Sequence, residues 1–308
     1  MKVLITFNPV AGKGRAAVAA QAISAHIEGL RLKDGRVIEV VVLETRLDPL
    51  DEWLTPHLES LDLLVVLGGD GAVGMLARAV LETGVPIFHY PTGTENLFSR
   101  EYGMQADPVH LLNAIEEGTV VETDVAEIDG TLMLLCASVG FDAEVVHDLA
   151  SRRTGSISHL SYVMPLLRTL WRWRRFRSRV SIAVDDGTFS EPLPGVLVIA
   201  NSRQYALRLD PAPEASTTDG ALDVVFLPAA NAFQLFLWGI RCRLGSHLAH
   251  PETFFARGSG ITVRCDPPAR LQVDGDAIQP EIAFETLQAR ILDQKLRVLR
   301  PPSEKPAM

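Results

Sequence analysis

The sequence that decides the fold runs from Leu63 to Gly71 and reads LLVVLGGDG. An unbroken apolar run that is too short for a typical helix and ends in glycines is typical of a buried parallel strand followed by a turn. Glycines let main-chain N–H groups approach a phosphate, and a carboxylate among them can hold a metal ion or orient an attacking hydroxyl. The run therefore predicts a buried strand that presents Asp70 to a ligand. The alternative is that Asp70 only caps the following helix.

Length and composition indicate a globular protein of two domains. The 308 residues are 47% apolar and 22% charged, with a mean hydropathy of +0.15, which is enough for two cores. No apolar run approaches the roughly 18–20 residues that span a bilayer, and Val3–Phe7 stops at Asn8-Pro9, short of a signal peptide. We therefore expect a cytoplasmic location. The formal charge of -9 argues against general nucleic-acid binding.

The cysteines indicate neither a disulfide framework nor a zinc site. There are three, Cys136, Cys242 and Cys265, an odd number at wide spacing. We expect reduced thiols in the core.

The first 120 residues alternate between strand and helix patterns, which implies a parallel sheet with right-handed crossovers. The first predicted helix follows Arg15 and ends at about Leu30. The other helices are predicted at Pro49–Leu61, Val73–Glu82, Leu97–Tyr102 and Pro108–Glu117. The other strands are predicted at Val3–Phe7, Val37–Leu43 and Val85–Tyr90. In such a sheet the loops after the strands meet at the carboxyl edge, where open α/β folds bind ligands. The loops at Asn8–Arg15, Glu44–Arg46, Gly68–Gly71 and Pro91–Asn96 should therefore form one site.

The first of these loops has the composition of an anion site. Glycines with Lys13 and Arg15 precede a helix, so free N–H groups and the helix dipole would face a phosphate. The Gly-Lys-Ser/Thr ending of a Walker A loop is missing. The alternative is a solvated turn.

From about Thr123 the chain is predicted to be mostly short strands, which indicates a β-sandwich-like second domain. We place the domains at 1–123 and 124–294, with a tail from about Lys295 packing back on the first and Pro301–Met308 disordered. Two helical regions, Ser158–Arg177 and Ala232–Leu244, interrupt the strands. The strands are predicted at Leu132–Ser138, Val180–Val184, Val196–Ala200, Leu222–Leu227, Ile261–Arg264, Leu271–Val273 and Ala289–Leu292.

Several ordered motifs resemble the diacylglycerol kinase catalytic domain family, which includes bacterial lipid kinases and sphingosine kinases. In the first half they are Asn8-Pro9-x-x-Gly12-x-Gly14, Gly68-Gly69-Asp70-Gly71 and Pro91-x-Gly93-Thr94-x-Asn96. In the second half they are Gly140-Phe141-Asp142-Ala143, Asn201, Asp219-Gly220-Ala221-Leu222-Asp223, Asp274-Gly275-Asp276 and Leu296–Pro301. The resemblance implies a parallel sheet like those of phosphofructokinase and NAD kinase, a C-terminal β-sandwich, and a kinase that binds ATP in the interdomain cleft and phosphorylates a lipid hydroxyl.

The resemblance also assigns roles to residues. Nucleotide contacts would be Asn8, Gly12, Lys13, Gly14, Arg15, Thr45, Gly69, Gly71, Gly93, Thr94 and Asn96. Asp70 would be the base that takes the acceptor proton, and Asp276 would help to hold Mg²⁺ through water. Asp142 would face the acceptor, and Asp219 with Asp223 would hold a structural Mg²⁺, which prefers hard oxygen ligands. The alternatives are a hairpin-turn residue for Asp276 and a polar residue at a strand end for Asp142.

Three positions depart from the family pattern. Ala72 stands where the family usually has Thr, Asp276 is one methylene shorter than the usual Glu, and Thr218 stands where bacterial members often have a second Asp. The first two affect catalytic geometry, since displacements of about 1 Å can cost about a hundredfold in rate. The third weakens the structural metal site.

A helix rich in arginine and tryptophan indicates contact with an anionic membrane. Arg168, Arg172, Arg175 and Arg179 recur at helical spacing among Trp171, Trp173 and Phe176. The alternative is a helix packed on the sandwich with a solvated basic face. Met164, Leu167, Phe233, Phe236 and Trp238 would line a lipid cavity or fill cores.

The sequence thus predicts a lipid kinase that uses ATP and Mg²⁺ and acts on a lipid substrate, peripherally at the inner membrane surface. One alternative is a NAD kinase, which shares the glycine–aspartate turn. Another is a non-catalytic homologue that binds nucleotide or lipid, in line with Ala72 and Asp276. A homodimer is left open, and no nucleic-acid partner is expected.

Overall fold

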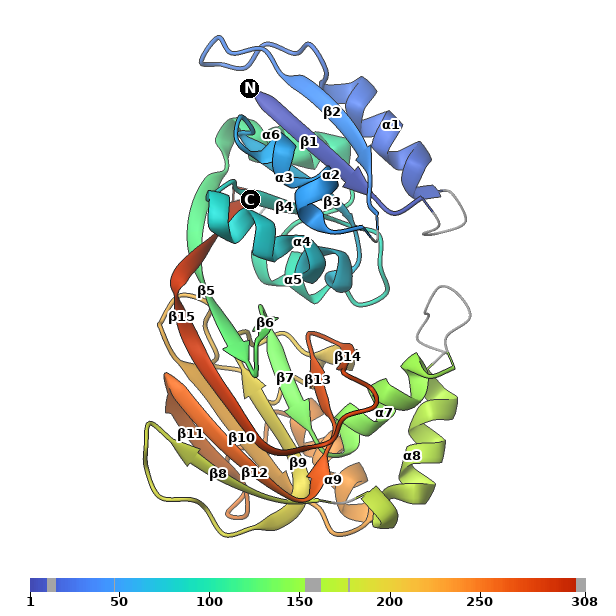
Figure 1. Ribbon diagram of the computed structural model, residues 1–308, viewed down its shortest axis with the longest axis vertical. Coiled ribbons are helices and arrows are strands. Elements are labelled where there is room, and N and C mark those ends of the chain that lie inside the picture. Colours follow the sequence, from blue (N-terminus) through green and yellow to red (C-terminus); the bar gives the residue numbers. More distant parts are fainter. Residues whose placement is uncertain (10–14, 47, 153–161, 177, 303–308) are drawn as a thin grey trace. The chain divides into compact units, whose positions relative to one another are not determined.

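The computed structural model describes residues 1–9, 15–46, 48–152, 162–176 and 178–302, without the side chains of 15 and 174–176 (Figure 1). Its contacts divide the chain into two compact units. One consists of Met1–Thr123 with the segment from Gln294 onward, and the other is Asp124–Asp293. Each unit is described by itself.

The first unit is built on the predicted parallel sheet. Its strands are β1 (Lys2–Phe7), β2 (Glu39–Glu44), β3 (Leu63–Gly68) and β4 (Ile87–Pro91), in the order β2-β1-β3-β4. All three pairings are parallel, and every residue of β3 is buried. An apolar run buried on both faces is the expected sequence of a central parallel strand. The prediction of this sheet is confirmed.

Helices connect these strands close to where the pattern predicts them. They are α1 (Arg15–Ile27), α2 (Leu50–Trp53), α3 (Thr55–Leu58), α4 (Asp70–Thr83), α5 (Leu97–Tyr102) and α6 (Pro108–Glu117). Helix α4 buries Val73, Leu76, Ala77 and Val80 and ends at Gly84, whose φ of 69° is left-handed, a conformation that glycine adopts without strain. The predicted helix over Pro49–Leu61 is wrong in one respect, because it forms two short helices, with Pro56 in the first turn of the second.

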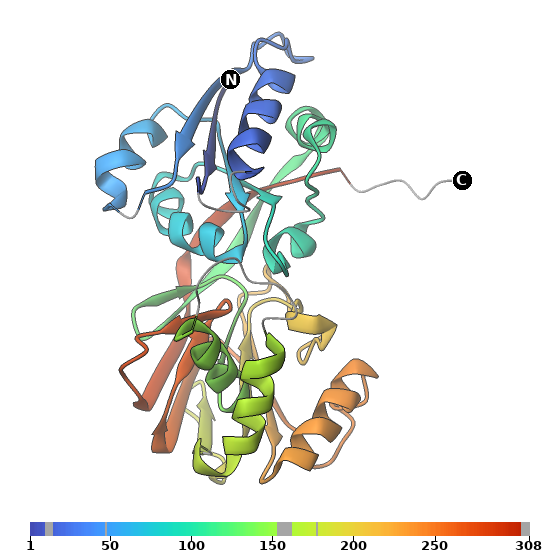
Figure 2. The same ribbon diagram turned by 90° about the vertical axis from the view of Figure 1, so that its right-hand side faces the viewer.

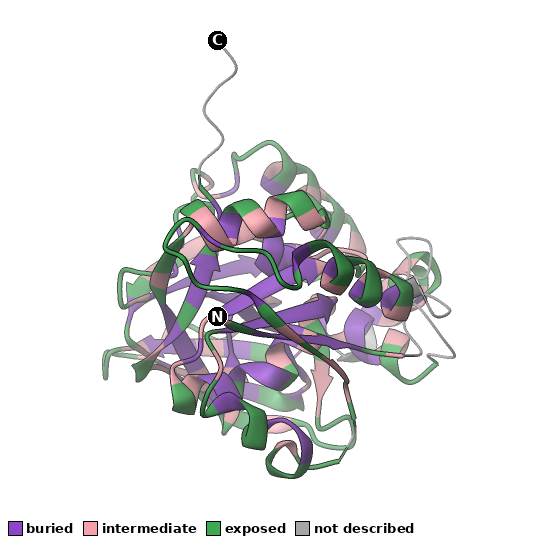
Figure 3. Cartoon of the chain, turned by 90° about the horizontal axis from the view of Figure 1, so that it is seen from above, coloured by how far each residue is buried: buried purple, intermediate pink, exposed green. Residues whose placement is uncertain are grey.

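The second unit is an antiparallel β-sandwich, as predicted. One group of paired strands runs β14-β13-β7-β9-β10-β11. A second consists of β8, β12 and β15, and it is connected to the first because β8 also pairs with β9. Their side chains form a core that includes Leu197, Val224, Val263 and Leu287. In Figure 3 buried residues occupy most of the strands and one side of the helices, and exposed residues occupy the loops and the outer helix surfaces. The strands are β5 (Thr119–Ile128), β6 (Thr131–Met133), β7 (Cys136–Val139), β8 (Arg179–Val184), β9 (Leu193–Ala200), β10 (Leu222–Pro228), β11 (Phe254–Gly258), β12 (Gly260–Ala269), β13 (Leu271–Val273), β14 (Asp276–Ile278) and β15 (Phe284–Arg300).

The helices of the second unit differ from the predicted ones. Helix α7 (Phe141–Ala150) was not predicted, while α9 (Ala232–Arg243) agrees with the prediction. Helix α8 (Val163–Phe176) ends before Arg179, which begins β8. The predicted helical face of four arginines is therefore wrong for Arg179, and the side chain of Arg175 lies outside the described residues.

The three cysteines are buried and form no disulfide, which confirms the expectation of core thiols. Burial raises the pKa of Cys242 to about 12 and that of Cys265 to about 11. Neither is therefore a reactive thiolate at neutral pH.

Candidate active site

Asp70 joins two loops at the carboxyl edge of the first unit's sheet. Its carboxylate oxygens accept hydrogen bonds from the backbone N–H groups of Leu97 and Phe98, both at 2.9 Å. These N–H groups belong to the first turn of α5, where carboxylates are favoured. Asp70 thus caps a helix, but not the one that follows it in sequence. The loop after β3 is thereby tied to the loop after β4.

Two glycines bring the same loops into contact. A Cβ atom on Gly93 would lie 2.6 Å from the Cα of Gly69 and 2.8 Å from Oδ1 of Asn96, closer than packed side chains allow. Asn96 accepts a hydrogen bond from Gly93 N and donates one to Gly93 O, each at 2.9 Å. Its φ of 51° is left-handed, which asparagine tolerates better than most residues. The sequence placed these residues correctly at one edge, but not their mutual contacts.

Other predicted nucleotide contacts border this edge. Thr45 follows β2, and its hydroxyl donates to the Phe7 carbonyl at 3.2 Å. Asn8 is exposed after β1 and Thr94 is half-buried between Gly93 and Asn96. Gly12, Lys13 and Gly14 lie outside the described residues, as does the side chain of Arg15, so their predicted roles stay predictions.

In the second unit, the half-buried Asp142 at the start of α7 contacts three buried polar side chains. Its Oδ2 accepts hydrogen bonds from the Ser138 hydroxyl (2.5 Å), the Tyr205 hydroxyl (2.6 Å) and Gln272 Nε2 (3.3 Å). Burial raises the pKa of Asp142, and the three donors oppose that shift. Burial and the neighbouring Asp142 raise the pKa of Tyr205 far above its usual value, so its hydroxyl stays a donor. Sequence reasoning missed Ser138, Tyr205 and Gln272, which no local motif marks.

The two aspartates of the β13–β14 hairpin, Asp274 and Asp276, have different roles. Asp274 and Gly275 have φ values of 50° and 88° and connect β13 to β14, the combination that a two-residue type I′ hairpin requires. The Asp274 carboxylate accepts N–H bonds from Leu134, Leu135 and Cys136 at 2.8–2.9 Å. Asp276, the predicted metal-linked carboxylate, is the exposed first residue of β14. Asp274 therefore anchors the hairpin that carries Asp276.

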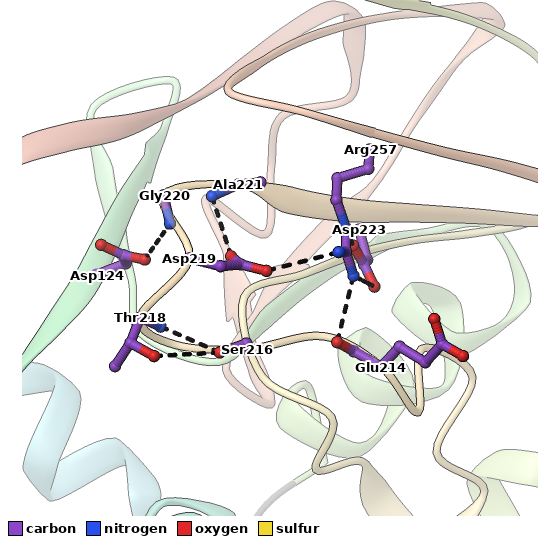
Figure 4. Close-up of polar contacts among 9 residues, drawn as sticks. All are labelled: Asp124, Glu214, Ser216, Thr218, Asp219, Gly220, Ala221, Asp223 and Arg257. Carbon is purple, nitrogen blue, oxygen red and sulfur yellow. Dashed lines mark hydrogen bonds and ion pairs between the residues drawn. The ribbon is translucent and has the colours of Figure 1, made fainter.

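An arginine contacts both carboxylates of the predicted structural magnesium site (Figure 4). Asp223 faces Arg257 across the β10–β11 pair. Arg257 donates from Nε to Asp223 Oδ1 at 2.5 Å and from Nη2 to Asp223 Oδ2 at 2.9 Å, while its Nη1 lies 3.7 Å from Asp219 Oδ2. Nη2 also donates to the Glu214 carbonyl at 3.2 Å. The Asp223 side chain is only 2% exposed, so its charge is compensated inside the protein.

These residues do not fit a structural magnesium ion. Both oxygens of Asp223 already accept from the guanidinium, and a divalent cation beside Arg257 would be repelled. The neighbouring loop is held by other groups, since Gly220 N donates to Asp124 Oδ2 at 2.7 Å and Ala221 N donates to Asp219 Oδ1 at 3.2 Å. Among the described residues, no group of three or more His, Cys, Asp or Glu side chains is placed to hold a metal.

Comparison with known proteins identifies the class. The diacylglycerol kinase catalytic domain matches residues 2–128, and the YegS C-terminal NAD kinase beta sandwich-like domain matches residues 136–300. With the glycine–aspartate loops of the first unit, these matches define a lipid kinase. The chain belongs to the family that combines these two domains, and the resemblance stated from the motifs is confirmed.

Relatives and solved structures agree with this assignment. A diacylglycerol kinase of Mycobacterium tuberculosis is 27% identical over 313 residues, covering 97% of this chain and 95% of the relative. A diacylglycerol kinase of Bacillus subtilis is 24% identical over 223 residues, covering 71% and 72%. The crystal structure of a diacylglycerol kinase from Bacillus anthracis has a TM-score of 0.66 at 15% identity, covering 98% of this chain and 97% of that one. An NAD kinase from Archaeoglobus fulgidus in complex with ATP has a TM-score of 0.53 at 16% identity, covering 98% and 94%. At these identities the two structures show the fold alone.

The contact between the glycine loops leads to a first prediction. In Gly93→Ala, the added methyl group must displace Gly69 or Asn96, and we expect kinase activity to fall at least about tenfold, since small displacements of loops in a kinase site are costly. Gly74→Ala in α4 is the matched control, because a Cβ there meets nothing within 4 Å. Initial rates and circular dichroism of both variants would test this. Wild-type activity in Gly93→Ala would show that the close approach is not needed.

Proposed function

We propose that this lipid kinase transfers the γ-phosphate of ATP to a hydroxyl of a diacylglycerol-like or sphingoid lipid. The observation that carries the proposal is the connection of two glycine loops through Asp70 at the carboxyl edge of a parallel sheet. That edge is where open α/β folds bind their ligands. The name of the Mycobacterium tuberculosis relative supports a diacylglycerol-like acceptor.

The chemistry asks the protein mainly for positioning and for neutralisation of charge. Backbone N–H groups of Gly69–Gly71 would donate to phosphates, and Lys13 with Arg15 would add positive charge. Asp70 would accept the proton of the attacking hydroxyl, a contribution typically worth about 10²–10⁴ in rate. Each carboxylate oxygen has about two acceptor sites, so the bonds to Leu97 and Phe98 leave capacity for this proton.

Magnesium would supply charge neutralisation at the nucleotide phosphates. Asp276 is the residue that would hold it, through water. This exposed carboxylate directly follows the hairpin that Asp274 anchors, and a hard oxygen ligand that leaves room for water suits Mg²⁺.

Asp142 would contact the polar group of the acceptor. Its Oδ2 is held by three donors, so the carboxyl group is fixed in direction before any acceptor binds. A preorganised hydrogen-bonding group distinguishes acceptors by the hydroxyl or amine that they present.

The proposed function is tested by offering acceptors side by side. The purified protein receives labelled ATP with Mg²⁺ and either a lipid extract or NAD, and products are identified by mass spectrometry. We expect label in a phosphorylated lipid and none in NAD. Label in NADP alone would make the protein a NAD kinase, and tight ATP binding without transfer to any acceptor would favour the non-catalytic alternative.

A further inference from the structure

Helix α8 carries two rows of side chains, one buried and one largely exposed. The inner row, Pro165, Thr169 and Trp173, is buried, and Trp173 packs edge-on against Phe141 at 5.6 Å. The outer row, Met164, Leu167 and Trp171, is 56%, 52% and 79% exposed. These residues are spaced by three and four, so they share one side of the helix. A helix that only covers a sandwich needs the inner row alone.

Helix α9 repeats this arrangement. Leu235, Trp238 and Cys242 face the core, and the Trp238 indole donates to the Pro228 carbonyl at 2.7 Å. Phe233 and Phe236 on the other side are 67% and 62% exposed, and Leu244 at the helix end is 73% exposed. The outer apolar face is the set Met164, Leu167, Trp171, Phe233, Phe236 and Leu244.

The two outer rows are neighbours. Figure 2 shows α8 and α9 side by side, and an open pocket of about 500 Å³ between them is lined by Trp171 and Phe233 among others. Of the nineteen large apolar side chains that are exposed among the described residues, nine lie on these helices or at the end of α9. Such a concentration marks an interaction site, since exposed apolar residues are normally scattered singly.

The charge of this surface is opposite to that of the whole protein. The chain carries a formal charge of -9, yet neither helix contains Asp or Glu. Arg241 and Arg243 stand in the last turn of α9, whereas the half-buried Arg172 of α8 lines a pocket with Glu144 and Asp148 of α7. Arg168 is not part of this charge, because it pairs with Asp148 of α7 at 2.6 Å. An apolar face bordered by arginines inside an acidic protein is complementary to a negatively charged apolar surface.

We propose that the outer apolar face docks on a bilayer that contains anionic lipid. Trp171, Phe233 and Phe236 would enter the headgroup boundary, where aromatic rings are favoured, and Arg241 and Arg243 would contact lipid phosphates. The sequence pattern indicated α8 alone, whereas the structure adds α9. The purpose of this docking rests on the proposed function, but docking itself needs no phosphoryl transfer.

Vesicle sedimentation without ATP tests the docking. We expect the protein to sediment with vesicles of phosphatidylglycerol and phosphatidylethanolamine, much less with phosphatidylcholine alone, and less at high salt. The double variant Trp171→Glu/Phe236→Glu should bind anionic vesicles at least about tenfold more weakly, because two apolar contacts are lost and two negative charges added. Val109→Glu is the matched control, because Val109 is 51% exposed on α6 of the first unit.

Tryptophan fluorescence gives a second readout. Of the four tryptophans, Trp53, Trp173 and Trp238 are at most 4% exposed, whereas Trp171 is 79% exposed. Anionic vesicles should shift the emission to shorter wavelength, and brominated acyl chains should quench it. Trp171→Phe should lose both signals and still sediment. Quenching that persists in Trp171→Phe would place the contact elsewhere and overturn the proposal.

The remaining outcomes separate docking from catalysis and from self-association. Wild-type protein that fails to sediment, or a double variant that sediments like the wild type, overturns the proposal. If the wild type is a dimer that does not bind vesicles and the double variant is a monomer, a second copy of the chain covers this face instead. Intact vesicle binding without any lipid product would leave the docking in place and contradict only the proposed function.

Discussion

The variant Asp70→Asn is expected to lose at least about a hundredfold in lipid phosphorylation while keeping its fold, because general-base contributions are typically about 10²–10⁴. An amide cannot take the proton of the acceptor hydroxyl. The amide also has an NH₂ group in place of one carboxylate oxygen, so it can no longer accept both hydrogen bonds from the N–H groups of Leu97 and Phe98. We expect the capping of α5 to weaken by about 1 kcal/mol. Initial rates with saturating ATP and the lipid product identified above would measure the loss.

The variant Asp107→Asn is the control for the loss of helix capping. This residue caps α6 by accepting from Val109 N at 3.2 Å and His110 N at 3.3 Å, with no part in the glycine loops. Asp107→Asn should therefore lose similar stability and keep wild-type activity. If Asp70→Asn retains activity within about threefold of the wild type, Asp70 is a helix cap and not the base.

The variant Arg257→Met is expected to lower the unfolding midpoint by about 4–8 °C. It leaves Asp223, which is 2% exposed, without its counter-charge. Breaking a fully buried pair costs about 3–5 kcal/mol. Because Arg257 is 40% exposed, we expect about 2 kcal/mol, and each kcal/mol moves the midpoint by roughly 2–4 °C in a unit of this size. Thermal unfolding followed by circular dichroism would measure the shift.

Further variants separate charge from packing. Asp223→Asn/Arg257→Met removes both charges and should be more stable than Arg257→Met alone, whereas Arg290→Met breaks an exposed pair with Glu127 and should change little. Because Arg257 already compensates these carboxylates, EDTA and Mg²⁺ should give the same midpoint for the wild type. If Mg²⁺ raises the unfolding midpoint of the wild type and Asp219→Asn abolishes that rise, a metal does bind at these carboxylates.

The sequence was sufficient for the parts of this protein that depend on local pattern. Apolar runs bounded by glycines predicted the parallel strands, and the strand–helix alternation placed the polar loops at one edge. Asp70 was found because a turn that approaches a ligand needs glycine and a short polar side chain. Gly93 and Asn96 were assigned through the resemblance to the diacylglycerol kinase catalytic domain family. The two-domain order followed from the change to short strands near Thr123.

What the sequence could not predict depends on tertiary contacts. Asp70 was considered as a cap for the next helix, but its partners lie 27 and 28 residues away in α5. The pairing of Asp223 with Arg257 depends on the register of β10 and β11, which no turn fixes because α9 lies between them. Strand β15 extends over 17 residues, yet only Ala289–Leu292 was predicted.

The last strand has a consequence for how the protein is made. Within the first unit, β4 pairs with β15 through Ile87 and Val298, and the Thr123 hydroxyl donates to the Leu296 carbonyl at 3.3 Å. A nascent chain folds from its N-terminus as it is synthesised, so β4 has no such neighbour until the segment from Gln294 onward emerges. An unpaired edge invites pairing with other chains. The β4 edge of the first unit should therefore stay unpaired until most of the chain has been synthesised.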